Sequence, residues 1–353
     1  AGSVPVRCSH SPLSESAVMP QPAFCNYHVS AQLAECKLVA ALRQWRPEDS
    51  WSQAKRLVHN RHVQINGNLC TDETRPLKAG DVVKVWQEPV AGPVRAEDVR
   101  VQYLDAHLVV VEKPAGVTTL RHSEERHWSE QRRQFQPTLD EMLRQILARK
   151  TKDSQRAARG RRPETPSIRP VHRLDRDTSG LMVFARTAEA ERRLVQLFRK
   201  HDLHRAYWAI AHGQVQAQTI ESYLIRDRGD GLRGSGSQSD DGQRAVTHVR
   251  PLEYLENYTL VECRLETGRT HQIRIHLAEA GHMVCGEKIY VRRLNGKPMK
   301  DRSGATRQAL HAAELGFLHP ITGQRLDFQM PLPEDMKRLL RRLRGPTAPE
   351  RKE

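Results

Sequence analysis

Hydrophobic and polar residues repeat with two different periods in the first ninety or so residues, and these periods predict a small α/β domain. Apolar residues recur at helical spacing over 33–45 and again over 52–60, where Ser52 is the expected N-cap. Alternation typical of strands then leads into an Asn-Gly pair at 66–67, the strongest short signal for a β-hairpin. A turn and a closing strand follow over 77–86.

The rest of the chain is richer in predicted strands. Two are predicted within 101–116, and the others at 180–187, 204–213, 219–225 and 258–268. The Gly/Ser-rich segment 229–242 is predicted to be a flexible loop.

Two helices interrupt these strands. Thr138 and Glu141 have the spacing of a capping box, followed by an apolar stripe over 139–147. Thr187 is the expected N-cap of a helix over 188–200, whose outer face is basic. Strands and helices do not alternate strictly. The predicted fold class is therefore α+β: a mixed, mainly antiparallel sheet with flanking helices, preceded by the small α/β domain.

Composition shifts predict where these parts begin and end. Two prolines and a glycine between the small domain and the first strand of the larger part indicate a linker. The Arg-rich stretch after residue 150 has little to bury and is predicted to be a mobile loop. The predicted organisation is a disordered tail over 1–32, a small domain over 33–87, a linker over 88–97, a large domain over 98–340 with a basic insertion over 120–168, and a basic tail over 341–353.

The charge balance favours a polyanionic partner. The 57 Lys and Arg exceed the 42 Asp and Glu and give a net charge of +15, which favours binding to nucleic acid or to an anionic surface. No apolar run approaches the roughly eighteen residues that span a bilayer. The six cysteines are scattered without a CxxC pair, which suits a reducing compartment. We expect a cytoplasmic monomer without membrane contact.

Two acids stand in a cationic stretch, "RPVHRLDRDTSG" at 169–180, and are the first candidates for chemistry. Their cationic neighbours are Arg169, His172, Arg173 and Arg176. Asp177 leads the run "DTSG" and is expected to stabilise a turn in which Gly180 takes an unusual conformation. Asp175 precedes a buried strand, so it either points into a cleft or forms an ordinary surface ion pair. The stretch alone does not decide between the two.

A second cluster, "LETGRTHQIRIHLAEAG" at 265–281, predicts an anion site. Thr270 is the expected cap of a helix that ends at Gly281. Arg269 and Arg274 lie near its N-terminus, where a phosphate or the carboxylate of Asp175 could bind.

Other chemistries have little support in the sequence. His271 and His276 are five residues apart and lack an acidic partner at ligand spacing, so we reject a metal site there. The chain has no GxxxxGK[ST], HExxH or GxSxG motif and no GxGxxG directly after a strand, so no motif indicates a bound cofactor or another class of catalysis. We expect no cofactor, and any nucleophile must be an ordinary carboxylate.

The small domain carries a basic cluster on its second predicted helix and the following turn. Its members are Lys55, Arg56, Arg61 and His62. Such a cluster is most often a solvated helix face. However, the order of helix, basic helix, "VQING" and "LKAGDVV" resembles the small RNA-binding module first described in ribosomal small-subunit protein four.

The large domain resembles the RluA-type family of RNA pseudouridine synthases. The resemblance rests on "HRLDRDTSGL", "RAYWAIAHG" and "TGRTHQIRIHL", with "LVVVEKPAG" upstream and "ALHAAELGFLHPITG" and "PLPEDM" downstream. These blocks keep the family order and cover roughly residues 98–340. Glu112 stands where Asn or Asp is frequent, Arg205 stands where Lys is usual, and the insertion at 120–168 is unusual.

This resemblance implies isomerisation of uridine to pseudouridine in RNA without a cofactor. Asp175 then matches the catalytic aspartate, which attacks the ribose or assists its deprotonation. Tyr207 matches the tyrosine that stacks near the base and helps to remove the carbon-5 proton, and Arg274 matches the arginine that pairs with the aspartate. Ile273 matches an apolar wall of the base pocket. Residues expected to contact substrate RNA are Arg173, Arg176, Arg269, Ile273, Lys55, Arg56 and Arg61.

Three alternatives stay open at this point. Ribosomal RNA is favoured over transfer RNA because of the front module. A protein that keeps the fold but only binds RNA or assists ribosome assembly is a second possibility, against which the intact set of Asp175, Tyr207 and Arg274 argues. A glycoside hydrolase using Asp175 with Glu266 is a third, but aromatics are only 5% of residues, too few for a sugar-binding groove.

Overall fold

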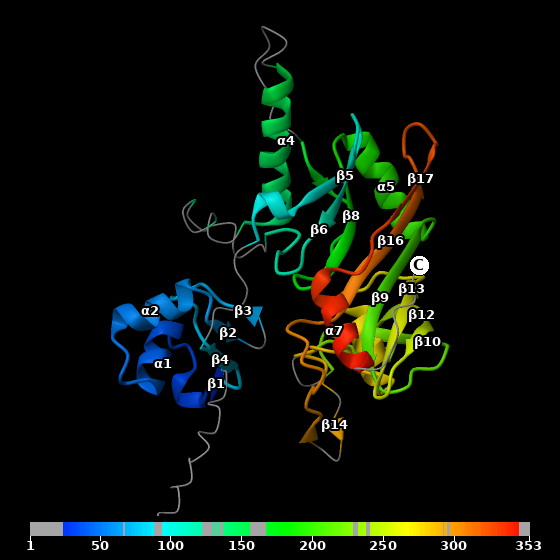
Figure 1. Ribbon diagram of the computed structural model, residues 1–353. Coiled ribbons are helices and arrows are strands. Elements are labelled where there is room, and N and C mark those ends of the chain that lie inside the picture. The colour runs from blue at the N-terminus through cyan, green and yellow to red at the C-terminus, as the bar shows by residue number, and fades with distance from the viewer. Residues whose placement is uncertain are drawn as a thin grey trace, which may run out of the picture. The chain divides into compact units, whose positions relative to one another are not determined.

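A computed structural model of the chain (Figure 1) divides into two compact units, Ala1–Gly92 and Pro93–Glu353. The structure describes residues 24–65, 68–87, 94–121, 130, 133, 137–155, 167–228, 232–237, 241–291, 293–294 and 297–345. Each unit encloses a hydrophobic core of its own.

The first unit packs two α-helices on a four-stranded antiparallel sheet. Its strands lie in the order β1-β4-β2-β3. Its elements are β1 Phe24–His28, η1 Ala31–Leu33, α1 Leu38–Trp45, α2 Trp51–His59, β2 Val63–Ile65, β3 Asn68–Leu69 and β4 Val82–Trp86. Leu38 and Leu42 of α1 are fully buried with Val58 of α2, which fixes both helices on one core.

The start of this unit differs from the prediction. The sequence predicts a disordered tail up to residue 32, but β1 pairs with β4 from Phe24 opposite Trp86 to His28 opposite Val82, so that prediction is wrong for 24–32. The helix predicted from residue 33 begins at Leu38. The residues just before it cannot be helical because Glu35 donates its N–H to Leu77 and Lys37 bridges to Pro76.

The second helix and the hairpin follow the prediction more closely. The N-cap of α2 is Ser50 and not Ser52: its Oγ accepts from the Gln53 N–H at 3.2 Å, and the Gln53 side chain accepts from the Ser50 N–H. This reciprocal pair satisfies two helix donors and starts the helix earlier. β2 and β3 form the predicted antiparallel pair, while the Asn-Gly turn at 66–67 lies outside the described residues.

The second unit is built on one large sheet. Its main path runs β11-β10-β12-β13-β9-β16-β8-β6-β5, with β17 beside β16 and β7 beside β8. β8 and β16 are parallel, and the other paired strands of the described chain are antiparallel. This architecture confirms the predicted mixed, mainly antiparallel sheet with flanking helices.

The strands of this unit are β5 Arg100–Leu104, β6 Leu108–Lys113, β7 Arg169–Pro170, β8 Ser179–Ala185, β9 His204–His212, β10 Gln218–Ile225, β11 Gly234–Gly236, β12 Gln243–Tyr254, β13 Tyr258–Leu265, β14 Arg293–Leu294, β15 Lys297–Pro298, β16 Leu310–Leu318 and β17 Arg325–Gln329. The helices are η2 Ala96–Asp98, α4 Leu139–Gln155, α5 Ala188–Lys200, α6 Gln272–Glu279 and α7 Glu334–Arg344.

Helices cover both faces of the sheet because buried strands present alternate residues to opposite sides. In β6, Val109 and Val111 join the core under α4, α6 and α7, whereas Leu108 and Val110 join the core under α5. Figure 1 shows α5 beside β8 at this end of the sheet. The helix residues in the first core include Leu139, Leu143, Ile273, Leu277, Met336 and Leu339, and those in the second are Ala190 and Leu194.

The helix predictions hold with small changes. Thr187 caps α5 by accepting from the Ala190 N–H at 3.2 Å, as predicted. Before α4, Glu141 accepts from the Thr138 N–H at 3.1 Å, but the Thr138 hydroxyl donates to Asp140, so only half of the predicted capping box forms.

Three further segments differ from their predictions. α4 continues through 150–155, where a mobile loop was expected, and the remainder of that loop to 166 lies outside the described residues. The first residues of the predicted basic tail, 341–344, are the last turn of α7. The predicted loop at 229–242 contains the short strand β11, which pairs with β10. In the part of the chain that the structure describes, no helix is both long and apolar enough to cross a membrane.

Candidate active site

Asp175 lies in the loop between β7 and β8, and this loop is fixed by contacts with its backbone. The fully buried Lys113, at the end of β6, donates through Nζ to the carbonyls of Pro114, Arg176 and Thr178 at 3.0, 2.9 and 2.7 Å. The Gly116 N–H donates to the Arg176 carbonyl as well, at 2.8 Å. The backbone that follows Asp175 is therefore held by the "EKPAG" turn, 60 residues earlier in the chain.

The exit of the loop is set by a glycine. Gly180 has φ +123°, and a Cβ there would lie 2.2 Å from the Ala312 carbonyl oxygen. No side chain fits, because Gly180 of β8 lies directly opposite Ala312 of the parallel strand β16. The predicted unusual conformation of Gly180 is confirmed.

Asp175 is paired with a buried arginine. Arg274 Nη1 donates to Asp175 Oδ2 at 2.9 Å from the first turns of α6. The Arg274 guanidinium also donates through Nε and Nη2 to both oxygens of Glu287, at 2.7 and 2.8 Å. The side chain of Arg274 is 6% exposed and that of Glu287 is not exposed at all. A buried guanidinium held from two sides in this way cannot turn away from Asp175.

Glu287 is an acceptor for more than Arg274. Its Oε1 also accepts backbone N–H groups of Lys288, Ile289 and Tyr290. Burial opposes ionisation of this carboxyl, but the hydrogen bonds and charge of Arg274 outweigh burial, so the pKa of Glu287 lies below its usual value. Glu287 is therefore an anion that anchors Arg274.

The second oxygen of Asp175 faces a histidine. His271 Nε2 lies 3.6 Å from Asp175 Oδ1, and its Nδ1 lies 2.7 Å from the Tyr290 hydroxyl. His271 is the N-cap of α6 in the left-handed conformation, φ 60°, so the prediction that Thr270 caps this helix is wrong. Gly281 ends the helix as predicted, with φ +88°. Burial lowers the pKa of His271 despite the charge of Asp175, so the ring is neutral at pH 7.

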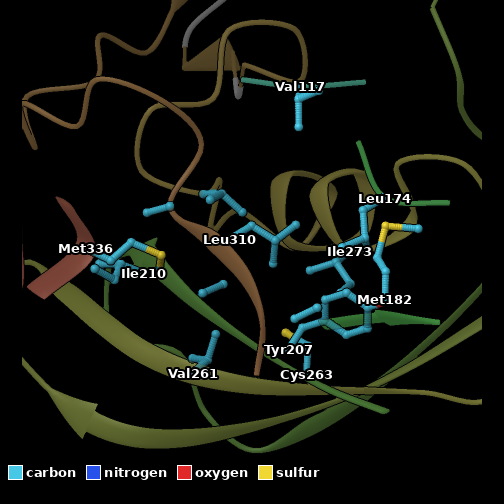
Figure 2. Packing of buried hydrophobic residues seen from close by; sticks show 14 of the residues in the cluster. Val117, Leu174, Met182, Tyr207, Ile210, Val261, Cys263, Ile273, Leu310 and Met336 are labelled. Atoms are coloured by element: carbon cyan, nitrogen blue, oxygen red, sulfur yellow. The ribbon is translucent and has the colours of Figure 1, made fainter. Parts of the chain in front are cut away.

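Apolar side chains pack around Tyr207 near the carboxylate. Figure 2 shows Leu174, Met182 and Ile273 gathered around the ring of Tyr207. Tyr207 projects from β9 and is 8% exposed, and Ile273 belongs to α6 next to Arg274. Burial, with a contribution from Asp175, raises the pKa of Tyr207, so its phenol is protonated at neutral pH. The arrangement offers a flat aromatic surface and aliphatic walls beside one oriented carboxylate.

Two of the cations predicted around Asp175 within 169–180 differ from that prediction, because one is neutral and the other is already paired with an acid. Burial, followed by the charge of Arg205, lowers the pKa of His172 to about 3, and His172 Nε2 accepts the Val183 N–H at 3.1 Å. His172 is thus a neutral structural residue and not one of the cations around Asp175. Arg169 pairs with Glu191 at 2.9 Å.

The arginines of the large domain that are predicted to contact RNA differ in how exposed they are to solvent. Arg173 is exposed. Arg176 is half-buried, and its Nε donates to the Gly116 carbonyl at 3.2 Å. Arg269 is exposed and donates through Nε to the Arg244 carbonyl at 3.1 Å. The carboxylate of Asp177, predicted to stabilise the turn, has no hydrogen-bond partner within the described residues, and the turn instead uses the Thr178 N–H and the Asp175 carbonyl.

The basic cluster of the small unit lies on and after α2. Lys55 is exposed but forms an ion pair with Glu73 at 3.2 Å, and Arg56 is exposed on the same helix. Arg61 has φ 70° just beyond the helix, and His62 Nδ1 lies 2.9 Å from the Trp86 carbonyl oxygen. A hollow beside Arg56 and His62 is also lined by Asp49, Gln53, Leu57 and Asn60.

Sequence reasoning missed Lys113, Glu287 and Tyr290 as residues that position the site. The signal that could have identified Lys113 is its place at the end of a uniformly apolar strand. Such a strand is buried, so a lysine at its end is buried with it. Burial lowers the pKa of Lys113 to about 7. Glu287 and Tyr290 stand in "GEKIY", which carries no local pattern that points to Arg274.

Among the described residues, no group of three possible metal ligands gathers at this site. Both ring nitrogens of His276 are hydrogen-bonded, to the hydroxyls of Thr247 and Ser222, so neither is left for a metal. Elsewhere in the described chain, one atom each of His212, Cys285 and Asp301 lies within 4.8 Å of the others. Asp301 is already occupied there, accepting from His212 at 3.0 Å and from the N–H groups of Gly286 and Ser303.

Comparison with protein families identifies both units. Residues 107–279 match the family model described as RNA pseudouridylate synthase. The matched segment contains Asp175, Tyr207 and Arg274. Residues 36–83 match the S4 domain.

Curated proteins and solved structures agree with these matches. The chain is 36% identical over 283 residues to ribosomal large subunit pseudouridine synthase D of Zymomonas mobilis, which covers 78% of this chain and 84% of that protein. It is 36% identical over 304 residues to the uncharacterized RNA pseudouridine synthase YlyB of Bacillus subtilis, covering 84% and 91%. The structure of human RNA pseudouridylate synthase domain containing 4 is similar with a TM-score of 0.53 at 25% identity, covering 69% of this chain and 92% of that one.

Proposed function

Because the chain belongs to the RluA-type family of RNA pseudouridine synthases and carries an N-terminal S4 RNA-binding domain, we propose that it isomerises uridine in the RNA of the large ribosomal subunit. The enzyme class follows from the family. The substrate is supported by the names of several relatives of this length, which are large-subunit synthases. Transfer RNA is the alternative substrate.

The observation that carries the site assignment is the carboxylate of Asp175, fixed by Arg274 near the apolar side chains packed around Tyr207. In this proposal Asp175 attacks the ribose or assists its deprotonation while the uracil detaches, turns and rejoins through carbon-5. Ile273 forms one wall for the uracil, and Tyr207 stacks against it. Because the phenol of Tyr207 is protonated in the free protein, it can accept the carbon-5 proton only after giving up its own.

RNA binding is proposed to supply the energy that exposes the uridine. Extruding a stacked base costs a few kcal/mol, and contacts with phosphates offset that cost. Arg173, Arg176 and Arg269 are proposed to contact RNA beside the site, and Lys55, Arg56 and Arg61 to contact it from the S4 domain. The net charge of +15 supports binding to a polyanion such as RNA.

We further propose that the chain acts as a monomer in the cytoplasm. The five cysteines in the described part of the chain are all free, which suits a reducing compartment.

The two rival functions have less support. Glu266, the partner acid of a hydrolase, is half-exposed and lies 2.8 Å from His248 Nε2, in an exposed hydrogen bond that needs no substrate. A protein that only binds RNA would have no need to keep Asp175 oriented by a buried Arg274–Glu287 pair.

The test is pseudouridine formation on unmodified large-subunit ribosomal RNA transcribed in vitro, with an unmodified transfer RNA in parallel. We expect the parent chain to modify the ribosomal transcript. Asp175→Asn should abolish this activity while RNA affinity stays within a few-fold, because the change is nearly isosteric. Preference for the transfer RNA would contradict the proposed substrate, and turnover by Asp175→Asn above a few per cent would contradict the assigned nucleophile.

A further inference from the structure

Arg205 is a buried cation whose charge no described residue neutralises. It lies on β9, two positions before Tyr207 and on the same face of the strand, and it is 9% exposed. Its Nε is buried without a hydrogen-bond partner. Within the described residues, neither a carboxylate nor a carbonyl accepts from its guanidinium. Most other arginines near the site have such a partner, as Arg274 and Arg176 do.

The surroundings of Arg205 hold it in place without compensating its charge. The guanidinium carbon lies 5.4 Å from the centre of the Phe198 ring. Its Nη1 lies against Gly268, where an added Cβ would be only 3.1 Å away. The ionisable neighbours His172 and His201 have pKa values lowered by burial and by the charge of Arg205.

An unpaired charge in such a place is unfavourable in the free protein. Arginine is almost never this buried without a partner, and burying a charge without a counter-charge is unfavourable. A partner that arrives with the substrate would compensate it. Uracil is neutral, so the anions of an RNA substrate are its phosphates, which fit the planar fork of arginine.

The position of Arg205 relative to Tyr207 suggests which phosphates of the RNA it binds. Two residues along a strand span about 7 Å, so the guanidinium of Arg205 begins about that far along β9 from Tyr207. Gly268 lies in the turn before α6, and the N-terminus of a helix adds positive potential for an anion. We propose that Arg205 binds a backbone phosphate of the target nucleotide or of its direct neighbour. The proposal rests on the proposed function, since it takes Tyr207 to face the base.

The first test compares Arg205→Met with Arg325→Met in binding to the large-subunit transcript at several salt concentrations. Arg325 is a matched control because it is exposed and already paired with Asp327 at 2.7 Å. Loss of one phosphate contact should reduce the slope of log affinity against log salt by about 0.7–0.9. We expect this change, with an affinity loss of about tenfold or more at low salt, for Arg205→Met only. An unchanged slope and affinity would overturn the proposal.

The second test needs no RNA and uses inorganic phosphate as the probe. Phosphate in place of chloride at equal ionic strength should raise the melting temperature of the parent and of Arg325→Met more than that of Arg205→Met, because ligand binding stabilises the folded state. In chloride, Arg205→Met should melt no lower than the parent. Equal phosphate responses, or a lower melting temperature in chloride with an unchanged salt slope, would make Arg205 a structural residue and overturn the proposal.

A second substitution covers the case in which Arg205→Met does not fold, and the two readouts separate this proposal from the proposed function. If Arg205→Met does not fold, Arg205→Gln removes the charge while keeping polar atoms, and the same results are expected of it. A parent chain that makes no pseudouridine would contradict the proposed function. The phosphate response would still decide whether Arg205 binds an anion.

Discussion

Replacing Glu287 by Gln tests the buried pair that orients the catalytic aspartate. The substitution keeps the shape of the side chain and the oxygen that accepts from the backbone at 288–290, but it removes the negative charge beside Arg274. Breaking a buried ion pair by removing one partner costs about 3–5 kcal/mol. Asp175 remains as a second partner of Arg274, so we expect the free energy of unfolding to fall by about 2–4 kcal/mol at pH 7.

The pH dependence of this loss identifies its origin. The folded pKa of Glu287 lies below its usual value of 4.5. Its stabilising contribution is therefore complete above that usual value and is lost as the pH falls through the folded pKa. The difference in stability between the parent and Glu287→Gln should be constant from pH 7 down to about 5, and should shrink at lower pH as the parent is protonated.

Urea unfolding at a series of pH values measures this difference, and Glu262→Gln is the matched control. Glu262 is also buried, but its partners Arg250 and Arg264 are more than half exposed, so their charges return to water and the loss should be under about 1 kcal/mol. Turnover by Glu287→Gln should fall tenfold or more, since Arg274 would no longer be fixed against Asp175. A loss below about 0.5 kcal/mol at pH 7, or one that persists unchanged at low pH, would refute the reasoning.

Two further predictions concern Lys113, which holds the loop after Asp175, and the S4 domain. Lys113 has a folded pKa of about 7, against a usual value of 10.5. Between these pH values the unfolded chain holds more protons than the folded chain, so the stability of the parent should rise with pH. Urea unfolding at pH 7 and 9 should show this rise in the parent and not in Lys113→Met. Deleting residues 1–92, which form a separate unit, should flatten the salt dependence of RNA binding by roughly two to four units if two to four cations there contact phosphates. The remaining unit should still fold and convert uridine at saturating RNA, and an unchanged salt slope would show that the S4 domain contributes no phosphate contacts.

Sequence determined the elements whose cause is local. The stripe and cap of α5 follow from the spacing of Ala190 and Leu194 and from Thr187 in front of them. Uniformly apolar runs predicted β6 and β8 because both faces of these strands are covered by helices. The family followed from short contiguous blocks that keep the same order in the chain.

Tertiary structure decided whatever depends on contacts between distant parts of the chain. β1 is ordered because β4 lies beside it, and no property of its own sequence shows that partner. Lys113 clamps a carbonyl 65 residues later, and Arg274 reaches Asp175 from 99 residues away. Glu287 anchors Arg274 from a loop beyond the helix, which no spacing rule connects to it.

Charge states were decided by burial in the same way. In the sequence His172 and Arg205 are cations like their neighbours. In the fold His172 is neutral and accepts a backbone N–H, while the buried Nε of Arg205 has no hydrogen-bond partner among the described residues. Residue type sets which charge a side chain can carry, but the solvent and partners left to it after folding set whether it carries that charge and what it can bind.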